Sequence, residues 1–117
     1  MIELHLVLRV PLTKTRPMID ALQALAGAAR AEPGCIAVEV YQAAGIPSCV
    51  CYIETWQSEI KLRKMILSRH FSQLAALMEQ SIEPPDCQFR FIEEIRALEY
   101  AAQVRECSGD SLHFLSN

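Results

Sequence analysis

The sequence predicts an α+β fold of the ferredoxin-like, split βαβ class, in which helices cover one face of a four-stranded antiparallel sheet. Two observations support this fold class: four segments alternate apolar and polar residues as strands do, and intervening segments repeat apolar residues at helical spacing. A third observation is their order along the chain, which is strand, helix, strand, strand, helix, strand.

Two apolar patterns of different period occupy the first third of the chain. Residues 2–10 predict a strand, because every second side chain is apolar: Ile2, Leu4, Leu6, Leu8 and Val10. A helix follows, with Thr15 suited to its N-cap and Pro17 to its first turn, and with an apolar stripe made by Met18, Leu22, Leu25, Ala26 and Ala29. Pro33 and Gly34 are turn residues and end this helix.

The second and third strands form a predicted hairpin. Residues 35–42 alternate, and one of their faces is made by Ile36, Val38 and Val40. Residues 49–56 also alternate, with one face made by Val50, Tyr52, Glu54 and Trp56 and the other by Cys49, Cys51, Ile53 and Thr55. The loop between the two strands contains Gly45 and Pro47, which are typical turn residues.

Further helices and a fourth strand complete the order. Ser58 is suited to the N-cap of a short helix with the apolar residues Leu62, Met65 and Ile66. Ser68 is suited to the N-cap of a second helix, whose apolar stripe is Phe71, Leu74, Ala75, Met78 and Ile82. Residues 87–96 predict the last strand, with one face made by Phe89, Phe91 and Ile95. We expect one domain over residues 1–98 and an extension over residues 99–117, helical at first and flexible beyond.

Composition and charge argue against several classes of protein. The net charge is −3 and the 11 basic residues form no run, so neither a nucleic acid nor an anionic membrane is the expected partner. No apolar run approaches the length of a transmembrane helix, and the charged, alternating first residues do not resemble a signal peptide. Five cysteines, an odd number, indicate free thiols in a reducing compartment. We therefore expect a cytoplasmic protein.

The sheet face without helices should be polar if water alone covered it. Instead Val7, Ala37 and the two cysteines of residues 49–56 dilute the polar residues on whichever face is turned outward. The apolar share of the chain, 51%, also lies slightly above the usual range for a soluble domain. We interpret the uncovered face as the interface of a two-fold homodimer.

Three segments carry a family resemblance: EPGCIAVEVYQ, YIETWQS and SRHFSQLAALME, in this order and at this spacing. They resemble the antibiotic biosynthesis monooxygenase (ABM) family, and the resemblance covers residues 2–96. The family implies a dimeric α/β barrel in which two ferredoxin-like sheets meet. Its members include cofactor-free oxygenases of phenols and quinols, haem-degrading enzymes and isomerases of signalling sugars, so the fold alone does not define the reaction.

Three positions test the haem-degrading branch of this family. Its enzymes need an asparagine on the first strand, where this chain has Leu8, and a tryptophan on the short helix, where it has Met65. Their iron-ligating histidine corresponds to Ala75. Because all three residues are missing, the resemblance implies a protein that does not degrade haem.

The resemblance places a pocket between the sheet and the helices, and His70 is the best candidate there for a catalytic base. At the start of a helix, the positive end of the dipole favours a neutral imidazole, which can accept a proton. The other interpretation is that His70 caps the helix while Phe71 fills the core. Trp56, Tyr41 and Tyr52 are candidates for contact with an aromatic substrate, or else packing residues of the sheet. The apolar lining is predicted to consist of Leu6, Leu8, Leu62, Met65, Ile66 and Phe71.

Two functions follow from these residues. The first is a cofactor-independent monooxygenase of a small aromatic, phenolic or quinol substrate, which needs a base and an apolar pocket but no cofactor or metal. The second is a non-enzymatic dimeric module for ligand binding or stress response, which the aliphatic residue at position 8 favours. Cys49 and Cys51 share a strand face, and we interpret them as structural thiols; the alternative is a zinc site completed by His5 or Cys35.

Overall fold

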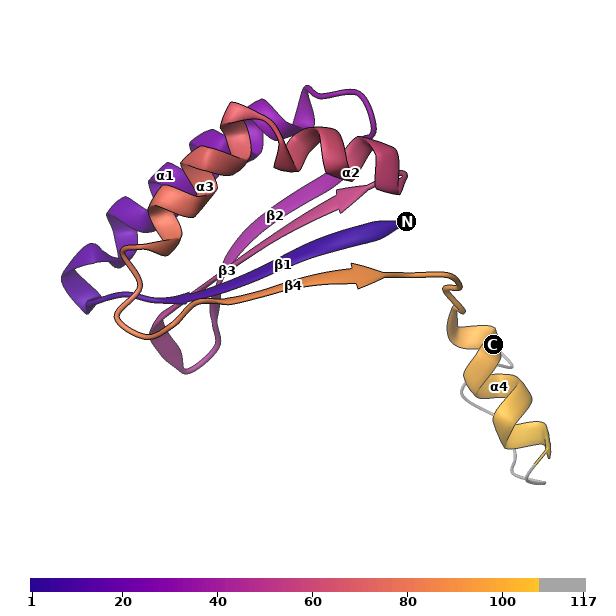
Figure 1. Ribbon diagram of the computed structural model, residues 1–117. Coiled ribbons are helices and arrows are strands. Elements are labelled where there is room, and N and C mark those ends of the chain that lie inside the picture. The colour runs from indigo at the N-terminus through magenta and orange to yellow at the C-terminus, as the bar shows by residue number, and fades with distance from the viewer. Residues whose placement is uncertain (108–117) are drawn as a thin grey trace.

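The computed structural model describes residues 1–107 and shows one four-stranded antiparallel sheet with helices packed on one face (Figure 1). The strands are β1 Ile2–Arg9, β2 Cys35–Ala43, β3 Ile46–Trp56 and β4 Asp86–Phe91, and they lie in the order β2-β3-β1-β4. The helices on the sheet are α1 Thr15–Arg30, α2 Glu59–Ile66 and α3 Arg69–Met78, and a 3₁₀ turn, Leu12–Lys14, precedes α1. The predicted ferredoxin-like α+β fold is confirmed.

The core lies between the central strands and the helices. Across the β1–β3 pair, Leu4 lies opposite Glu54 and Leu6 opposite Tyr52, so alternate residues of both strands face the helices together. The buried residues of α1 pack against them at helical spacing: Met18, Leu22, Ala26 and Ala29. Removing a leucine side chain such as that of Leu22 from water contributes roughly 1.5–3 kcal/mol, and this burial holds α1 on the sheet.

The β2–β3 hairpin is tighter than the sequence suggested. β3 begins at Ile46, before the expected residue 49, because Ala43 already pairs with Ile46. Only Ala44 and Gly45 form the turn, and Gly45 has a φ of +77°, a left-handed conformation that glycine adopts without strain. The expected loop residues therefore belong largely to the sheet.

Two apolar residues lie outside their expected faces. Ile36 is 57% exposed, because the register of β2 shifts between Cys35 and Ala37 and turns it away from the covered face. Ile82 was expected on the stripe of α3, but that helix ends before it, and the Ile82 amide instead donates to the carbonyl of Arg9. The chain leaves the helix here in order to return to the sheet.

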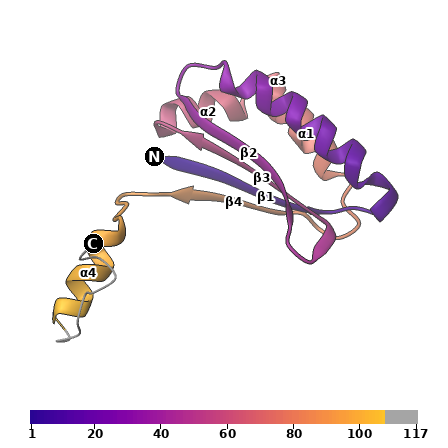
Figure 2. The same ribbon diagram turned by 180° about the vertical axis from the view of Figure 1, so that it is seen from behind.

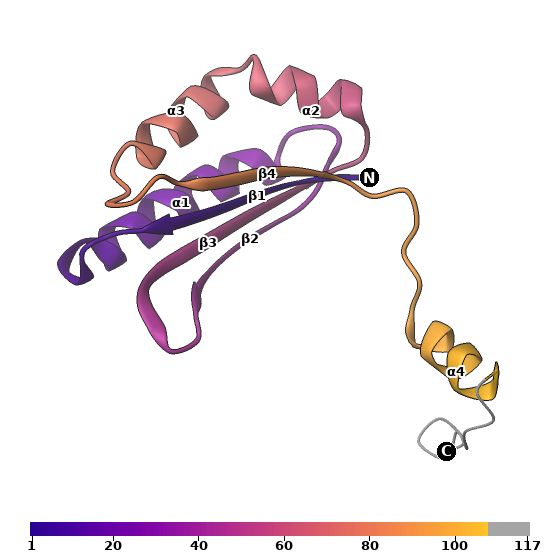
Figure 3. The ribbon, with the colours of Figure 1, turned by 60° about the horizontal axis from the view of Figure 1, so that its bottom comes forward.

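The last strand is shorter than expected. β4 ends at Phe91, because the next residue already bonds to Met1 and β1 offers no further partner. Ile95, expected in this strand, lies beyond it and is exposed. An extended stretch then leads to α4, Leu98–Cys107, which has no buried residue and stands apart from the sheet (Figure 3). The predicted flexible end of the extension lies outside the described residues.

The face of the sheet opposite the helices is uncovered in this chain (Figure 2). We call it the open sheet face, and its central residues are Glu3, His5, Val7 and Arg9 of β1 with Cys49, Cys51, Ile53 and Thr55 of β3. It is neither apolar nor polar throughout, as the sequence predicted. Within residues 1–107, no helix is long and apolar enough to span a membrane.

Candidate active site

The centre of the candidate site is a carboxylate inside the core. Glu54 has no exposed surface, although it lies in the middle of β3 opposite Leu4 of β1 and Val38 of β2. A buried carboxylate without partners would cost several kcal/mol. The sequence must therefore supply hydrogen-bond donors around it.

Three donors satisfy this carboxylate. The Tyr52 hydroxyl donates to Glu54 Oε2 at 2.5 Å, and the Trp56 indole Nε1–H donates to Oε1 at 2.9 Å. His70 Nε2 lies 2.5 Å from Oε2, and because an ionised carboxylate only accepts, the imidazole donates. Strand alternation places Tyr52 and Trp56 beside Glu54 on one face, whereas His70 comes from α3 above the sheet.

Tyr52 acts here as a proton donor in a hydrogen bond and not as a base. Burial raises the pKa of its hydroxyl far above the ordinary range, and the charge of Glu54 and the bond to it raise that pKa further. Burial, followed by the Glu54 charge, also raises the pKa of the nearby Cys35 thiol. Both groups therefore stay protonated at neutral pH.

His70 is the one member of this cluster that reaches the edge of the core. Its side chain is 14% exposed, and it is the second residue of α3. With Nε2–H directed to Glu54, the second ring nitrogen, Nδ1, is left as an acceptor in the neutral ring. Nδ1 is buried and has no hydrogen-bond partner among the described residues. The geometry resembles the pairing in which a carboxylate orients a histidine base.

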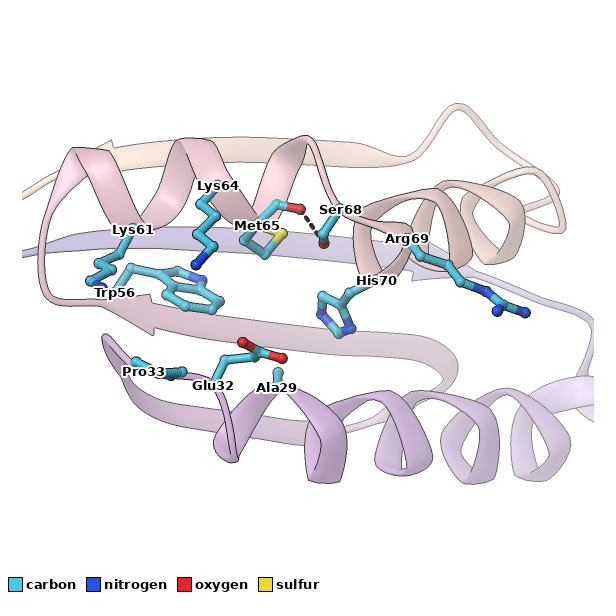
Figure 4. A pocket seen from close by; sticks show the side chains of 10 residues that line it. All are labelled: Ala29, Glu32, Pro33, Trp56, Lys61, Lys64, Met65, Ser68, Arg69 and His70. Carbon is cyan, nitrogen blue, oxygen red and sulfur yellow. Dashed lines mark hydrogen bonds between the residues drawn. The ribbon is translucent and has the colours of Figure 1, made fainter.

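A cavity of about 360 Å³ opens beside this cluster, within the range of small-molecule sites (Figure 4). It lies between the end of α1 and the α2–α3 junction. At that junction, the Ser68 hydroxyl donates to the carbonyl of Met65 at 2.6 Å. The lining residues are Ala29, Glu32, Pro33, Trp56, Lys61, Lys64, Met65, Ser68, Arg69 and His70.

The structure brings together only part of the predicted site. Of the predicted residues, the cavity is lined by His70, Trp56 and Met65. The others pack in or against the core on the same side of the sheet: Leu6, Leu8, Tyr52, Leu62, Ile66 and Phe71. Tyr41 is 46% exposed and pairs with Cys51 of the open sheet face, so it lies on the opposite side from the cavity.

Sequence reasoning missed Glu54 and the basic residues of the cavity. One signal for Glu54 was present, since it alternates with Tyr52 and Trp56 on a face that is otherwise apolar. Lys64 and Arg69 look like ordinary exposed helix residues in the sequence, and only the angle between α2 and α3 places both at one opening.

The cysteines do not form a metal site with other described residues. Across residues 1–107, no three His, Cys, Asp or Glu side chains lie close enough to hold an ion. Cys49 is buried and Cys51 is half-buried, and both are free thiols. The interpretation of this pair as structural thiols stays a prediction.

Comparison with known proteins agrees with the fold. The sequence model of the antibiotic biosynthesis monooxygenase family matches residues 1–77. No curated protein matches this chain. Solved structures do, among them a conserved protein from Methanosarcina mazei Go1 with 24% identity and a TM-score of 0.69, over 76% of this chain and 89% of that one.

Two similar structures are named as candidate antibiotic biosynthesis monooxygenases. The one from Deinococcus radiodurans has 17% identity and a TM-score of 0.73, over 83% of this chain and 97% of that chain. The one from Nitrosomonas europaea has 16% identity and a TM-score of 0.69, over 80% and 100%. These structures share the fold, and the match of the family model covers well over half of the sequence. The chain therefore belongs to the antibiotic biosynthesis monooxygenase family.

Proposed function

We propose that this protein is a cofactor-independent monooxygenase that oxidises a small, electron-rich phenolic or quinol substrate. The observation that carries the proposal is the hydrogen-bonded pair of the buried Glu54 and His70, at the edge of a cavity that Trp56 also lines. The family membership supports the oxygenase class. His70 is the base of the proposed reaction, and Glu54 is a positioning residue.

The first step of the proposed reaction is removal of the phenolic proton by His70 Nδ1. The Nε2–H bond to Glu54 keeps the ring oriented, and the carboxylate stabilises the imidazolium that forms. Since Nδ1 is covered in the free protein, neighbouring side chains must yield as the substrate enters, and catalytic hydrogen bonds often form only then.

The phenolate then reduces oxygen without a further reductant. It transfers one electron to O₂, and the resulting radical pair combines to form a carbon–oxygen bond at a ring CH carbon ortho or para to the phenolate oxygen. The imidazolium of His70 returns its proton to the peroxide, which becomes a hydroperoxide. Loss of the remaining hydrogen on that carbon breaks the O–O bond and releases water. The balance is one phenol with a ring CH and one O₂ giving one quinone-type carbonyl product and one water, so the substrate supplies all the electrons.

Oxygen uptake tests this function directly. We expect the protein to consume one O₂ per substrate with at least one member of a panel of hydroquinones and anthrones, and labelled O₂ should place one labelled atom in the carbonyl product. Heat-denatured protein is the control. If no member of the panel is oxidised faster than in buffer, the enzyme proposal fails and the alternative, a dimeric ligand-binding or stress-response module, replaces it.

We further propose that the protein is a homodimer joined through the open sheet face. This face leaves Val7, Cys51 and Ile53 half-buried without any helix over them. A stable interface buries on the order of 1,000 Å² or more, which a sheet face of this kind can supply. The family resemblance, which implies two sheets meeting in a barrel, supports the same arrangement.

A charge placed in this interface should separate the two subunits. We expect Ile53→Asp to convert the dimer to a monomer at micromolar concentration, because the new carboxylate would lose its hydration on assembly and would lie beside the like charge of Glu39 on β2. Light scattering measures the mass. The control is Ile60→Asp at a 78% exposed position of α2, which should leave the dimer intact. A wild-type protein that is monomeric at this concentration would refute the arrangement.

A further inference from the structure

The opening of the cavity carries an excess of positive charge. Lys61 and Lys64 of α2 and Arg69 of α3 line it, against a single carboxylate, Glu32 (Figure 4). They include two of the three lysines in a chain whose net charge is −3. None of the three cations forms an ion pair with a described residue. Their charges are therefore available to a ligand.

One of these cations is held in place by close packing of the backbone. Gly34 has a φ of +91°, and a Cβ built on it would lie 2.5 Å from Cγ of Lys61. Only glycine permits this approach of the Lys61 stem, which therefore runs along the Gly34 backbone at the edge of the cavity. Ser58 fixes the same turn of α2 by accepting a hydrogen bond from the Lys61 amide.

The inner wall of the cavity is apolar and aromatic. Trp56 and Met65 line it, and each is at least 95% buried in the free protein. Because the indole N–H is already bonded to Glu54, Trp56 offers its ring and not a polar group to a ligand. Figure 4 shows Lys64 extending from α2 toward this ring. An apolar wall with cations at its opening suits a planar body bearing a negative charge.

We infer that the cavity binds an aromatic carboxylate, with the ring system against Trp56 and the carboxylate held by Lys61 and Lys64, which extend from α2 beside this ring (Figure 4). This inference rests on the proposed function in one respect: the aromatic carboxylate is the substrate only if the protein is an oxygenase. Binding itself depends on the cavity and its charges. Positive charges at the opening also favour the phenolate form of a bound substrate, so the test must separate a permanent acid group from a phenolate.

Two quinones distinguish a permanent carboxylate from a phenolate, because neither of them has a phenolic proton. Anthraquinone-2-carboxylate and anthraquinone-2-carboxamide have the same ring system and differ in charge. Trp56 is the only tryptophan of the chain, so quenching of its emission reports binding at this cavity, and calorimetry gives a second measurement. We expect the carboxylate to bind the full-length protein about tenfold more tightly than the carboxamide at low ionic strength.

Salt and substitution test whether the cations cause this preference. The ratio of the two affinities should shrink as the ionic strength rises from about 0.01 M to about 1 M, because the Debye length falls over this range from about 30 Å to about 3 Å. The double variant Lys61→Gln, Lys64→Gln should lose most of this preference. The control Lys14→Gln removes one positive charge at an exposed position outside the cavity and should keep the preference. Circular dichroism verifies that each variant is folded.

The outcomes separate this inference from the proposed function. Equal affinity for both quinones in the wild type, or an unchanged preference in the double variant, would overturn the inference. Neither result would bear on the proposed oxygenase, which oxygen uptake tests. A clear preference for the carboxylate in a protein that oxidises nothing would support the inference and refute the oxygenase. Oxidation of neutral quinols by a protein that binds both quinones equally would support the oxygenase and refute the inference of an aromatic carboxylate.

Discussion

Replacement of Glu54 by alanine is expected to lower the free energy of unfolding by about 3–5 kcal/mol. The change removes the acceptor of three hydrogen bonds and leaves the donors of Tyr52, Trp56 and His70 facing a gap in the core. Each donor that remains buried and unpaired costs roughly 1–3 kcal/mol, and the lost side-chain volume adds a cavity. Urea denaturation followed by far-UV circular dichroism measures the loss, with an unchanged slope showing that two-state unfolding is retained.

Two further variants show that the carboxylate itself is responsible. Glu54→Gln keeps the shape but turns an N–H toward one of the three donors, so we expect a smaller loss than in Glu54→Ala. Glu83→Ala removes an exposed carboxylate from the loop between α3 and β4 and should change stability by no more than about 0.5 kcal/mol. If Glu54→Ala were as stable as Glu83→Ala, the hydrogen bonds around Glu54 would not contribute to the fold.

The fold could be predicted because each strand and helix has a regular spacing of apolar residues in its own segment of the sequence. The alternation of Leu4, Leu6 and Leu8 in β1 reports a face that is fully buried, and the stripe through Met18 and Leu22 reports the face of α1 that covers it. Such patterns depend only on which face of an element meets the core. Their order along the chain then leaves few ways of arranging one sheet.

The deviations arise where the position of one element depends on another. Ile36 alternates correctly in the sequence, yet a register shift against β3 turns it outward. Ile82 continues the helical spacing, yet the chain must return to Arg9 and leaves the helix first. The spacing of apolar residues within one segment predicts neither its register against a neighbouring strand nor the residue at which the chain turns back.

The same limit explains what was missed in the candidate site. His70 stood out because a histidine at a helix start is a recognisable base candidate. Its partner, Glu54, is 16 residues earlier in the chain, and their contact exists only because α3 lies across β3. The paired residues Glu3 and His5, two positions apart on one strand, show that a sequence also offers histidine–glutamate pairs that do not line the cavity.

The second large effect concerns His70 as the base. We expect His70→Ala to lower kcat for a quinol or anthrone substrate by about 10²–10⁴-fold, the range for loss of a general base. Quenching of Trp56 should show that quinone affinity changes little, because the apolar wall and the cations at the opening remain. Oxygen uptake under saturating substrate gives kcat.

Chemical rescue distinguishes a base from a residue that only supports the fold. Added imidazole can occupy the space left in His70→Ala and accept the phenolic proton, so it should restore part of the lost rate, whereas a structural defect would not respond. The matched control is His5→Ala, which removes an imidazole bonded at 2.9 Å to Glu3 on the open sheet face, away from the cavity, and should neither lose kcat to a comparable degree nor respond to imidazole. Equal kcat in wild type and His70→Ala would leave an oxygenase whose substrate ionises without help from His70. In that case the role of Glu54 would be confined to stability, because the carboxylate acts on the proposed reaction only through the imidazole that it holds.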